Sequence, residues 1–162
     1  MFCVSLRLWS RRVNLSLCML FSLIVVATAT FTTYAQKTDD PVFADFKGVR
    51  IGMPTEEARK KLGSPKDKSD DQDFYLFNDN QAVQVYYDKA TKKVTAISID
   101  FMNGANQIPT AREIIGSEIE PKSDGSGYKM VRYPKAGYWV SYSKTAGDTP
   151  IITVTIQKLA GP

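Results

Sequence analysis

The chain has 162 residues, of which 43% are hydrophobic and 23% are charged, and it contains no histidine. This absence excludes Ser-His and Cys-His nucleophile pairs, a histidine general base and the commonest metal ligand. Most of the formal net charge of +4 arises before residue 36, where three of the 21 Lys and Arg residues lie but none of the 17 Asp and Glu residues. The rest of the chain carries +1 (18 minus 17). A nearly neutral chain without a clustered basic stretch lacks the pattern of a nucleic-acid binder, and we expect no nucleic-acid partner.

Residues 1–35 have the pattern of a cleavable signal peptide. Arginines without any acidic residue come first, an apolar run at 15–26 follows, and small residues come after it. The small residues predict cleavage after Ala35, or else after Ala29. An uncleaved membrane anchor is the alternative, but the apolar stretch is at the short end for crossing a bilayer. The sequence therefore predicts a periplasmic or secreted protein with no stable membrane span after cleavage.

Both cysteines, Cys3 and Cys18, lie inside this signal segment. Lipidation of Cys18 is disfavoured, because a lipidated cysteine follows a small residue and here it follows Leu17. The exported part is therefore expected to have no disulfide and no thiol chemistry, so a hydrophobic core must stabilise it. The roughly 127 residues that remain are enough for one domain.

The first half of that domain, residues 46–101, follows a polar segment at 36–45 that we expect to be a flexible leader. A short helix is expected to begin at Thr55, a favourable N-cap, and to end at Gly63. Strand patterns joined by short turns follow, and such turns predict antiparallel pairing. These patterns lie at 74–77, 82–88 and 94–101.

The second half, residues 102–162, repeats this order. A helix that begins near Pro109 and ends at Gly116 precedes three more strand patterns. These lie at 128–133, 138–143 and 151–157. We therefore predict an α+β fold in which two tandem α-β-β-β repeats form an antiparallel sheet backed by short helices on one face.

Alternation along the strands assigns the two faces of this sheet. Large apolar side chains point to one face, where they should pack beneath Ala58 and Leu62 of the first helix and Ile115 of the second. These side chains are Val83, Val85, Tyr87, Ile97, Ile99, Phe101, Tyr138, Val140, Tyr142, Ile152, Val154 and Ile156.

The opposite face carries mostly serine, threonine and glutamine, together with two large aromatic residues, Tyr86 and Trp139. We predict that this face is a binding surface, with Tyr86 and Trp139 as its anchors and Gln84 and Ser141 beside them. Ordinary cross-strand packing of the two rings is the alternative.

Residues 49–65 read Val-Arg-Ile-Gly-Met-Pro-Thr-Glu-Glu-Ala-Arg-Lys-Lys-Leu-Gly-Ser-Pro. This stretch resembles the opening of the outer-membrane assembly lipoprotein family (SmpA/OmlA, also called BamE), whose domains continue into antiparallel strands. The same unit in two copies resembles the β-lactamase-inhibitor-protein fold, in which a curved sheet backed by helices grips a partner on its open face. The resemblance implies a cell-envelope setting and this fold, although members of the first family carry a lipidated cysteine and a single copy.

The sequence contains no recognised motif for a cofactor or a metal. Gly125-Ser126-Gly127 lacks the lysine and the helix that follow in a phosphate-binding loop. An acidic cluster is present at Asp70, Asp71, Asp73 and Asp79. It lacks the glycine and the glutamate that an EF-hand calcium loop requires, so we expect a solvated loop, no metal and no cofactor.

Three functions stay open from the sequence. The leading hypothesis is an exported, non-enzymatic binding domain of a bacterial-type cell envelope, with a protein or an envelope component as its partner. An inhibitor of a secreted hydrolase is the alternative that the fold resemblance offers. An enzyme that uses only Asp, Glu or Tyr chemistry is the third, and converging carboxylates in a deep pocket would favour it.

Overall fold

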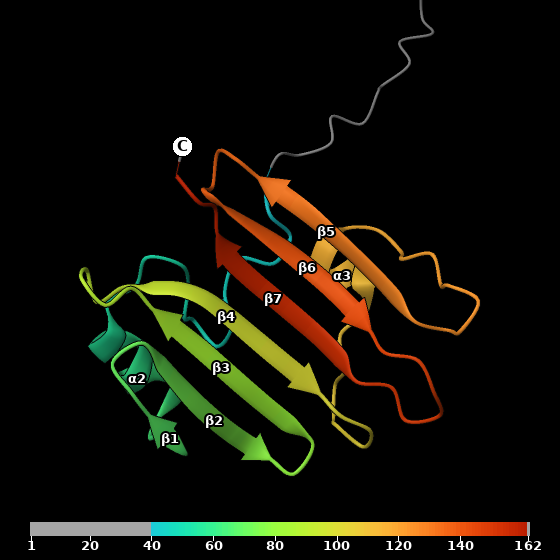
Figure 1. The fold of residues 1–162 in the computed structure, drawn as a ribbon, viewed down its shortest axis with the longest axis horizontal. Helices are drawn as coiled ribbons and strands as arrows, with labels where there is room; N and C mark the ends of the chain where they lie inside the picture. Colours follow the sequence, from blue (N-terminus) through green and yellow to red (C-terminus); the bar gives the residue numbers. More distant parts are fainter. Residues whose placement is uncertain (1–39, 162) are drawn as a thin grey trace, which may run out of the picture. The chain divides into compact units, whose positions relative to one another are not determined.

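The computed structural model describes residues 40–161. Within them the chain forms one sheet of seven antiparallel strands and two short helices (Figure 1). The strand order is β1-β2-β3-β4-β7-β6-β5. The fold is therefore α+β with an antiparallel sheet, as the sequence predicts. The expected signal peptide at 1–35 lies outside the described residues, as does the beginning of the expected leader.

The strands lie close to the positions that alternation predicts. They are β1 Asp67–Lys68, β2 Gln72–Asn78, β3 Gln81–Tyr87, β4 Val94–Phe101, β5 Gly127–Tyr133, β6 Tyr138–Lys144 and β7 Ile152–Lys158. The six longer strands match the six predicted patterns, with ends that differ by at most two residues. The short strand β1 was not expected, because its residues lie in the charged stretch that precedes the first strand pattern.

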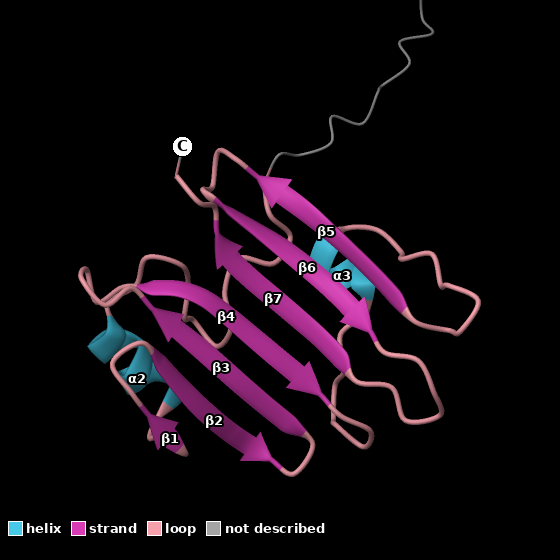
Figure 2. Cartoon of the chain, viewed as in Figure 1, coloured by secondary structure: helices cyan, strands magenta, loops and turns pink. Residues whose placement is uncertain are grey.

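The sheet has a central seam where β4 pairs with β7, from Ala96 opposite Gln157 to Phe101 opposite Ile152. The strands β1 to β3 lie on one side of this seam and follow α2, Thr55–Leu62, whereas β6 and β5 lie on the other side and follow α3, Ala111–Ile115 (Figure 2). The two halves have the same order of helix and strands, but the first half has the additional strand β1.

One face of the sheet forms the core with both helices. Val83, Val85, Ile97, Val140 and Val154 are completely buried there, in one cluster with the buried side chains of α2 and α3. The helix residues in this cluster are Ala58, Leu62, Ala111, Ile114 and Ile115. The predicted assignment of apolar side chains to the helix-covered face is therefore confirmed.

The helix α2 begins differently from the sequence prediction. Its N-cap is Pro54, which provides no side-chain cap, and Thr55 is the first helical residue rather than the cap. The Thr55 hydroxyl donates instead to the Lys92 carbonyl oxygen at 3.1 Å, and so does its N–H at 3.0 Å. Gly63 ends the helix at φ 86°, as predicted. Thr55 therefore ties α2 to the turn between β3 and β4.

The helix α3 has the side-chain cap that α2 lacks. The Thr110 hydroxyl accepts a hydrogen bond from the Glu113 N–H, and the Glu113 carboxylate accepts one from the Thr110 N–H at 2.7 Å. This reciprocal capping box stabilises the start of a helix of only five residues. Gly116 ends the helix in the left-handed conformation. The Thr-x-x-Glu pattern at 110–113 was the sequence signal for this cap.

The segment before α2 also lies along the core. The half-buried rings of Phe43 and Phe46 pack against the buried cluster. Phe46 and Val49 exchange two backbone hydrogen bonds of 2.9 Å across a turn in which Lys47 and Gly48 both have positive φ. Residues 43–49 are therefore anchored to the sheet before α2 begins.

Candidate functional site

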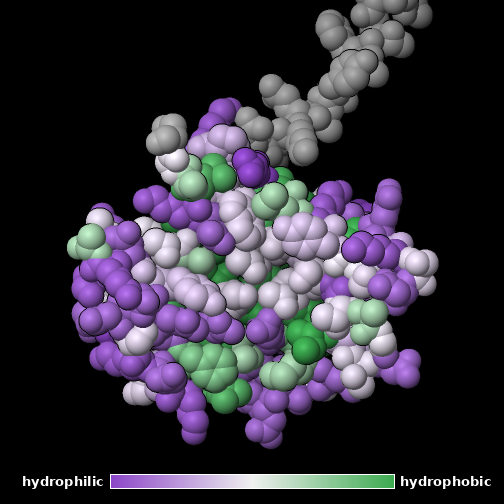
Figure 3. Space-filling view, viewed as in Figure 1, coloured by the Kyte–Doolittle hydropathy of each residue, from purple (hydrophilic) through white to green (hydrophobic). Residues whose placement is uncertain are grey.

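The sheet face opposite the helices is named here the open face. Figure 3 shows it in the same view as Figure 1, in which α3 lies behind β5 and β6. Its side chains form three rows across the strands from β2 to β5. The rows are Gln72, Tyr86, Ala96, Gln157, Trp139 and Arg132; Phe74, Gln84, Ser98, Thr155, Ser141 and Met130; and Leu76, Ala82, Asp100, Thr153, Ser143 and Tyr128.

All four residues predicted for the binding surface lie on the open face. Tyr86 and Trp139 share the first row and are both half-buried. They are three strand spacings apart, which is roughly 14 Å. Gln84 and Ser141 share the second row, but Ser141 is only 5% exposed and offers little surface to a partner. The open face therefore has two separated rings as its central anchors.

Hydrogen bonds fix the side chains around Tyr86. Its hydroxyl donates to Gln84 Oε1 at 2.6 Å, and Gln72 Nε2 donates to the same oxygen at 3.2 Å. These contacts hold the Tyr86 ring in one position on the face. A ring that is already fixed loses little conformational entropy when a partner packs on it.

The centre of the open face is polar and bonded across the seam. Ser98 and Thr155 are joined by a hydrogen bond of 3.3 Å, and the Thr153 hydroxyl donates to Asp100 Oδ1 at 2.7 Å. These pairs connect β4 with β7 at the level of side chains as well as backbone. The central strip is therefore a rigid polar surface between apolar flanks.

Exposed apolar side chains lie at both flanks of the open face. Leu76 on β2 is 48% exposed, and Tyr128 and Met130 on β5 are 58% and 38% exposed. Figure 3 shows the open face as a mainly purple and white surface with scattered green areas. These three residues were not predicted as part of the binding surface, although extending the same alternation along β2 and β5 would have placed them on this face.

A shallow groove of about 680 Å³ crosses the open face beside Tyr86. Ser98 and Thr155 form part of its floor, and Leu159 to Gly161 line it at the C-terminal end of β7. Trp139 does not line this groove. The structure therefore places the groove and the two rings on the same face without combining them in one pocket.

A buried ion cluster, formed by Arg59, Asp73, Tyr75 and Tyr87, lies on the other side of the sheet. The Arg59 guanidinium donates to both carboxylate oxygens of Asp73, at 2.8 and 3.0 Å. The Tyr87 and Tyr75 hydroxyls donate to Asp73 Oδ2 at 2.8 and 3.3 Å. This bidentate geometry is the strong form of an arginine–carboxylate pair. The cluster therefore joins α2 to β2 and β3.

The cluster changes the pKa values of its members. Burial alone would raise the pKa of Asp73, but the hydrogen bonds from Arg59 and Tyr87 outweigh it and hold the pKa below its usual value. The hydrogen bond to Asp73 is the main cause of the raised pKa of Arg59. Burial and the Asp73 charge raise the pKa of Tyr75 to about 12, and burial also raises that of Tyr87. The ion pair and the neutral phenols are therefore stable near neutral pH.

Sequence reasoning placed Asp73 in a solvated acidic loop, which is wrong. Asp73 is a residue of β2 and is completely buried, because alternation puts it on the helix-covered face beside Tyr75. The carboxylate accepts hydrogen bonds from three side chains. Within the described residues no buried side-chain nitrogen or oxygen lacks a partner. The cluster therefore has the properties of a structural ion pair.

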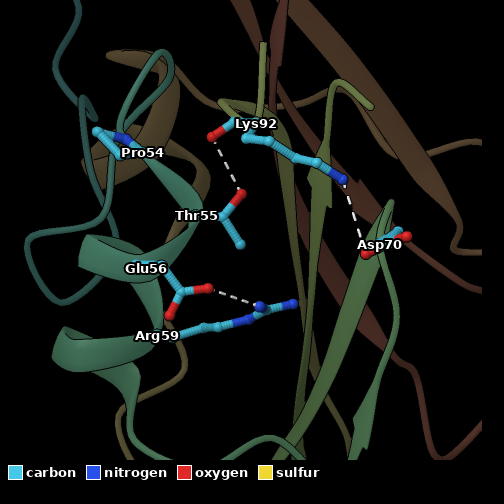
Figure 4. A pocket seen from close by; sticks show the side chains of 6 residues that line it. All are labelled: Pro54, Thr55, Glu56, Arg59, Asp70 and Lys92. Atoms are coloured by element: carbon cyan, nitrogen blue, oxygen red, sulfur yellow. Dashed lines mark hydrogen bonds and ion pairs between the residues drawn. The ribbon is translucent and has the colours of Figure 1, made fainter. Parts of the chain in front are cut away.

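A small pocket of about 280 Å³ opens next to this cluster, between α2 and the turn that follows β3 (Figure 4). Arg59 lines it with Glu56, which accepts from Arg59 at 2.9 Å. Lys92 lies across the pocket and approaches Asp70 at 3.6 Å. Each charge that faces this pocket already has a partner of opposite sign. The pocket therefore offers no free charge that would select a charged ligand.

Residues 40–161 contain no group of three or more acidic, histidine or cysteine side chains placed to hold a metal ion. Neither α2 nor α3 is long and apolar enough to cross a membrane, and the same holds for the rest of the described segment.

No protein-family model, no curated protein and no solved structure matches this chain. The candidate site is therefore defined by geometry: a polar sheet face with two half-buried central rings, of which Tyr86 is held by hydrogen bonds, and exposed apolar side chains at both flanks.

Proposed function

We propose that this protein is an exported, non-enzymatic binding domain that captures a protein partner on its open face. The observation that carries this proposal is the position of large side chains outside the core. Tyr86 and Trp139 at the centre, and Leu76, Tyr128 and Met130 at the flanks, lie on one face, and none of them belongs to the buried cluster. Aromatic and methionine side chains are enriched where proteins bind one another.

The open groove and polar centre of this face favour a protein surface as the partner. The groove beside Tyr86 is shallow and has a polar floor, which suits a protein surface better than a small apolar ligand. The exposed rings can pack against apolar atoms, while the polar strip between them supplies hydrogen bonds.

We further propose that the two halves arose as a tandem α-β-β-β repeat, with the fold of the outer-membrane assembly lipoprotein domain in two copies. Three features support this proposal. Both helices end at a glycine with positive φ, Gly63 and Gly116. The strands are arranged symmetrically about the β4–β7 seam, and the stretch at 49–65 resembles the opening of that family. The export pattern at 1–35 supports a cell-envelope setting.

A second candidate function is inhibition of a secreted hydrolase. It is favoured by the same open face, since the resemblance to the β-lactamase-inhibitor-protein fold implies a sheet that grips an enzyme. An Asp, Glu or Tyr enzyme receives less support, because the carboxylate of the buried ion cluster is enclosed and fully hydrogen-bonded.

The test is capture of partners from the cell envelope by the chain that begins after residue 35. Trp139→Ala should leave the unfolding free energy nearly unchanged and weaken capture by about 2 kcal/mol or more, the scale of an interface hot spot. Trp139→Phe should retain most of the affinity. Ile108→Ala is the matched control, because Ile108 is 41% exposed but lies in the link between β4 and α3, not on the sheet.

Two outcomes would contradict the proposed function. If Trp139→Ala unfolds the domain, the ring contributes to packing and not to a binding surface. If Trp139→Ala and Ile108→Ala both leave capture unchanged, the open face is not the contact surface.

A further inference from the structure

The strand β5 forms one edge of the sheet and is exposed along most of its length. It pairs with β6 on one side only, from Gly127 opposite Lys144 to Tyr133 opposite Tyr138. Tyr128 is 58% exposed and Met130 is 38% exposed. Exposed edge strands are templates for pairing with another strand.

Hydrogen bonds at the ends of β6 show which backbone groups of β5 point outward. The Leu159 N–H donates to the Gly137 oxygen, and the Thr145 N–H donates to the Ile151 oxygen. Gly137 and Thr145 therefore face β7. The backbone N–H and C=O groups of successive residues in an antiparallel strand point alternately to its two neighbours. Those of Tyr138, Val140 and Tyr142 therefore point toward β5. Their partners Tyr133, Val131 and Lys129 face back toward β6.

The remaining residues of the strand, Tyr128, Met130 and Arg132, direct their N–H and C=O groups away from the sheet. Within residues 40–161 no backbone group outside β5 and β6 donates to or accepts from these three residues. A row of free donors and acceptors is left along the edge.

The opposite edge of the sheet is different. There β1 pairs with Phe74 and Asp73 of β2, and the Lys66 N–H also donates to the Phe74 oxygen at 2.7 Å. The chain therefore covers the beginning of its own β2 edge with a short charged strand, whereas no described segment pairs with β5.

We infer that β5 pairs with β5 of a second copy of this chain, in antiparallel orientation and centred on Met130. This pairing would join two seven-stranded sheets into one continuous sheet with a two-fold axis. Met130 is the middle residue of β5, so this register uses the whole strand of both copies. Every outward-facing N–H then meets an outward-facing C=O.

The side chains are complementary in this register. On the open face, Met130 lies opposite Met130 of the second copy, and Tyr128 lies opposite Arg132. The guanidinium of Arg132 can stack on the Tyr128 ring twice, once on each side of the axis. Within residues 40–161 Arg132 makes no hydrogen bond or ion pair, so its guanidinium is available for this contact.

The ends of the paired segment are also defined. The next outward-facing position after Arg132 is Pro134, which has no N–H to donate. At the other end the Ser126 N–H already donates to Asp124 Oδ1 at 2.9 Å. In the proposed register Ser126 of each copy lies opposite Pro134 of the other copy. The hydrogen-bonded ladder therefore stops at a Ser126–Pro134 pair at both ends. This limits slippage to other registers.

On the helix-covered side, the register keeps the basic residues apart. Lys129 lies opposite Val131 of the second copy, and the two Lys129 side chains are diagonal neighbours with long, flexible chains. Their repulsion is screened at physiological ionic strength. The segment between α3 and β5 passes on this side. Its residue Ile119 packs so closely on Gly127 that a Cβ added to Gly127 would lie 2.6 Å from Ile119 Cδ1.

The first test measures the mass of the chain lacking residues 1–35 by sedimentation equilibrium. This part contains the compact unit that begins at Thr38 and its complete core. We expect a concentration-dependent dimer. Met130→Pro removes an outward N–H that β6 does not use, and should weaken dimerisation about a hundredfold through two lost hydrogen bonds. Met130→Ala keeps the N–H and should weaken it far less.

The second test is a cross-link, and it decides the matter even if Met130→Pro fails to fold. The chain after residue 35 has no cysteine. In the proposed register the two Cα atoms at position 130 are about 5.5 Å apart, within reach of a disulfide. Met130→Cys should therefore form a disulfide-linked dimer with oxidised glutathione. Tyr128→Cys should not form this disulfide, because position 128 lies opposite position 132 of the second copy and is four residues away from position 128 of that copy.

A monomer at all concentrations would overturn the inference, and so would a dimer that persists in a folded Met130→Pro variant. A dimer that cross-links through Tyr128→Cys but not Met130→Cys would also overturn it, since the register would be different. The dimer shares Tyr128 and Met130 with the proposed binding surface but does not use Trp139, so Trp139→Ala should leave the dimer intact and distinguishes failure of the inference from failure of the proposed function.

Discussion

The two helices are fixed to the same face of the sheet by different chemistry. The helix α2 is held through the buried ion cluster, in which Arg59 reaches the fully buried Asp73 at 2.8 Å. The helix α3 is held by three small or branched apolar residues and starts with a capping box. It also has an arginine–carboxylate pair, Arg112 with Glu118 at 3.0 Å, but both side chains are more than 60% exposed.

Two ion pairs of nearly equal length are therefore expected to contribute very differently to stability. The pair in α3 is surrounded by water, which replaces each contact when the pair opens. The pair in α2 has a carboxylate that water does not reach, so the loss of Arg59 would leave a buried charge without compensation. Tyr75 and Tyr87 add two hydrogen bonds to the Asp73 carboxylate, whereas beneath α3 the Tyr142 hydroxyl donates to the neutral Pro109 carbonyl oxygen at 3.2 Å.

The largest effect is expected for Arg59→Ala, which should lower the free energy of unfolding by about 3–5 kcal/mol, as for other broken buried ion pairs. Arg112→Ala is the matched control, and it should cost less than about 1 kcal/mol. Urea denaturation of both variants measures the difference. Similar losses in both variants would show that burial of Asp73 does not determine the stability.

Acidification is expected to lower the free energy of unfolding less than Arg59→Ala does. Protonation neutralises the Asp73 carboxylate, whereas the loss of Arg59 leaves it charged and without its counter-charge. The pKa of Asp73 is lowered in the folded state, so the unfolded chain takes up this proton first as pH falls. Its contribution to stability is therefore present above the ordinary pKa of 3.8 and is lost as pH falls below about 4. In Asp73→Asn the acid decrease in stability should be shallower.

At alkaline pH the stability is expected to fall as the pH rises, the reverse of the acid dependence. The pKa of Tyr75 is raised to about 12, so between pH 10 and about 12 the unfolded chain loses this proton first and stability falls. Thermal melts from pH 2 to 12 measure both limbs. An acid limb that is unchanged in Asp73→Asn would mean that the exposed carboxylates, not the buried ion cluster, cause it.

The smallest effect is expected at the start of α3. Thr110→Ala removes the side-chain cap and should lower the free energy of unfolding by about 1 kcal/mol. Thr110→Ser keeps a hydroxyl at the same position and should cost only a fraction of that. A thermal melt of the two variants side by side makes the measurement, and equal stability of both would exclude a role for the hydroxyl.

The strands could be predicted well because a single rule determines them. In β3 and β4 every second side chain is apolar, and the turn residues between the strands interrupt that alternation. The helix ends at Gly63 and Gly116 were predictable for a similar reason, since only glycine adopts positive φ there without strain.

The buried ion cluster was not predicted, although a signal existed. Asp73 was assigned by its acidic neighbours at 70 and 71, whereas extending the strand pattern back from Tyr75 would have turned it toward the core. Its partner Arg59 lies 14 residues away, and no local rule connects a helix residue with a particular strand residue. Such pairings depend on tertiary structure, and so does the low exposure of Ser141 among the predicted contact residues.

The β4–β7 seam also has a consequence for the order of folding. All other neighbouring strands are consecutive in the chain, whereas the hydrogen bonds that cross the seam join residues 53 and 57 positions apart, Thr153 with Asp100 and Thr155 with Ser98. Closing so long a loop costs entropy that the hairpins do not incur. We therefore expect the β4–β7 ladder to form last, after the hairpins on each side of it, and to limit the rate at which the continuous sheet is completed.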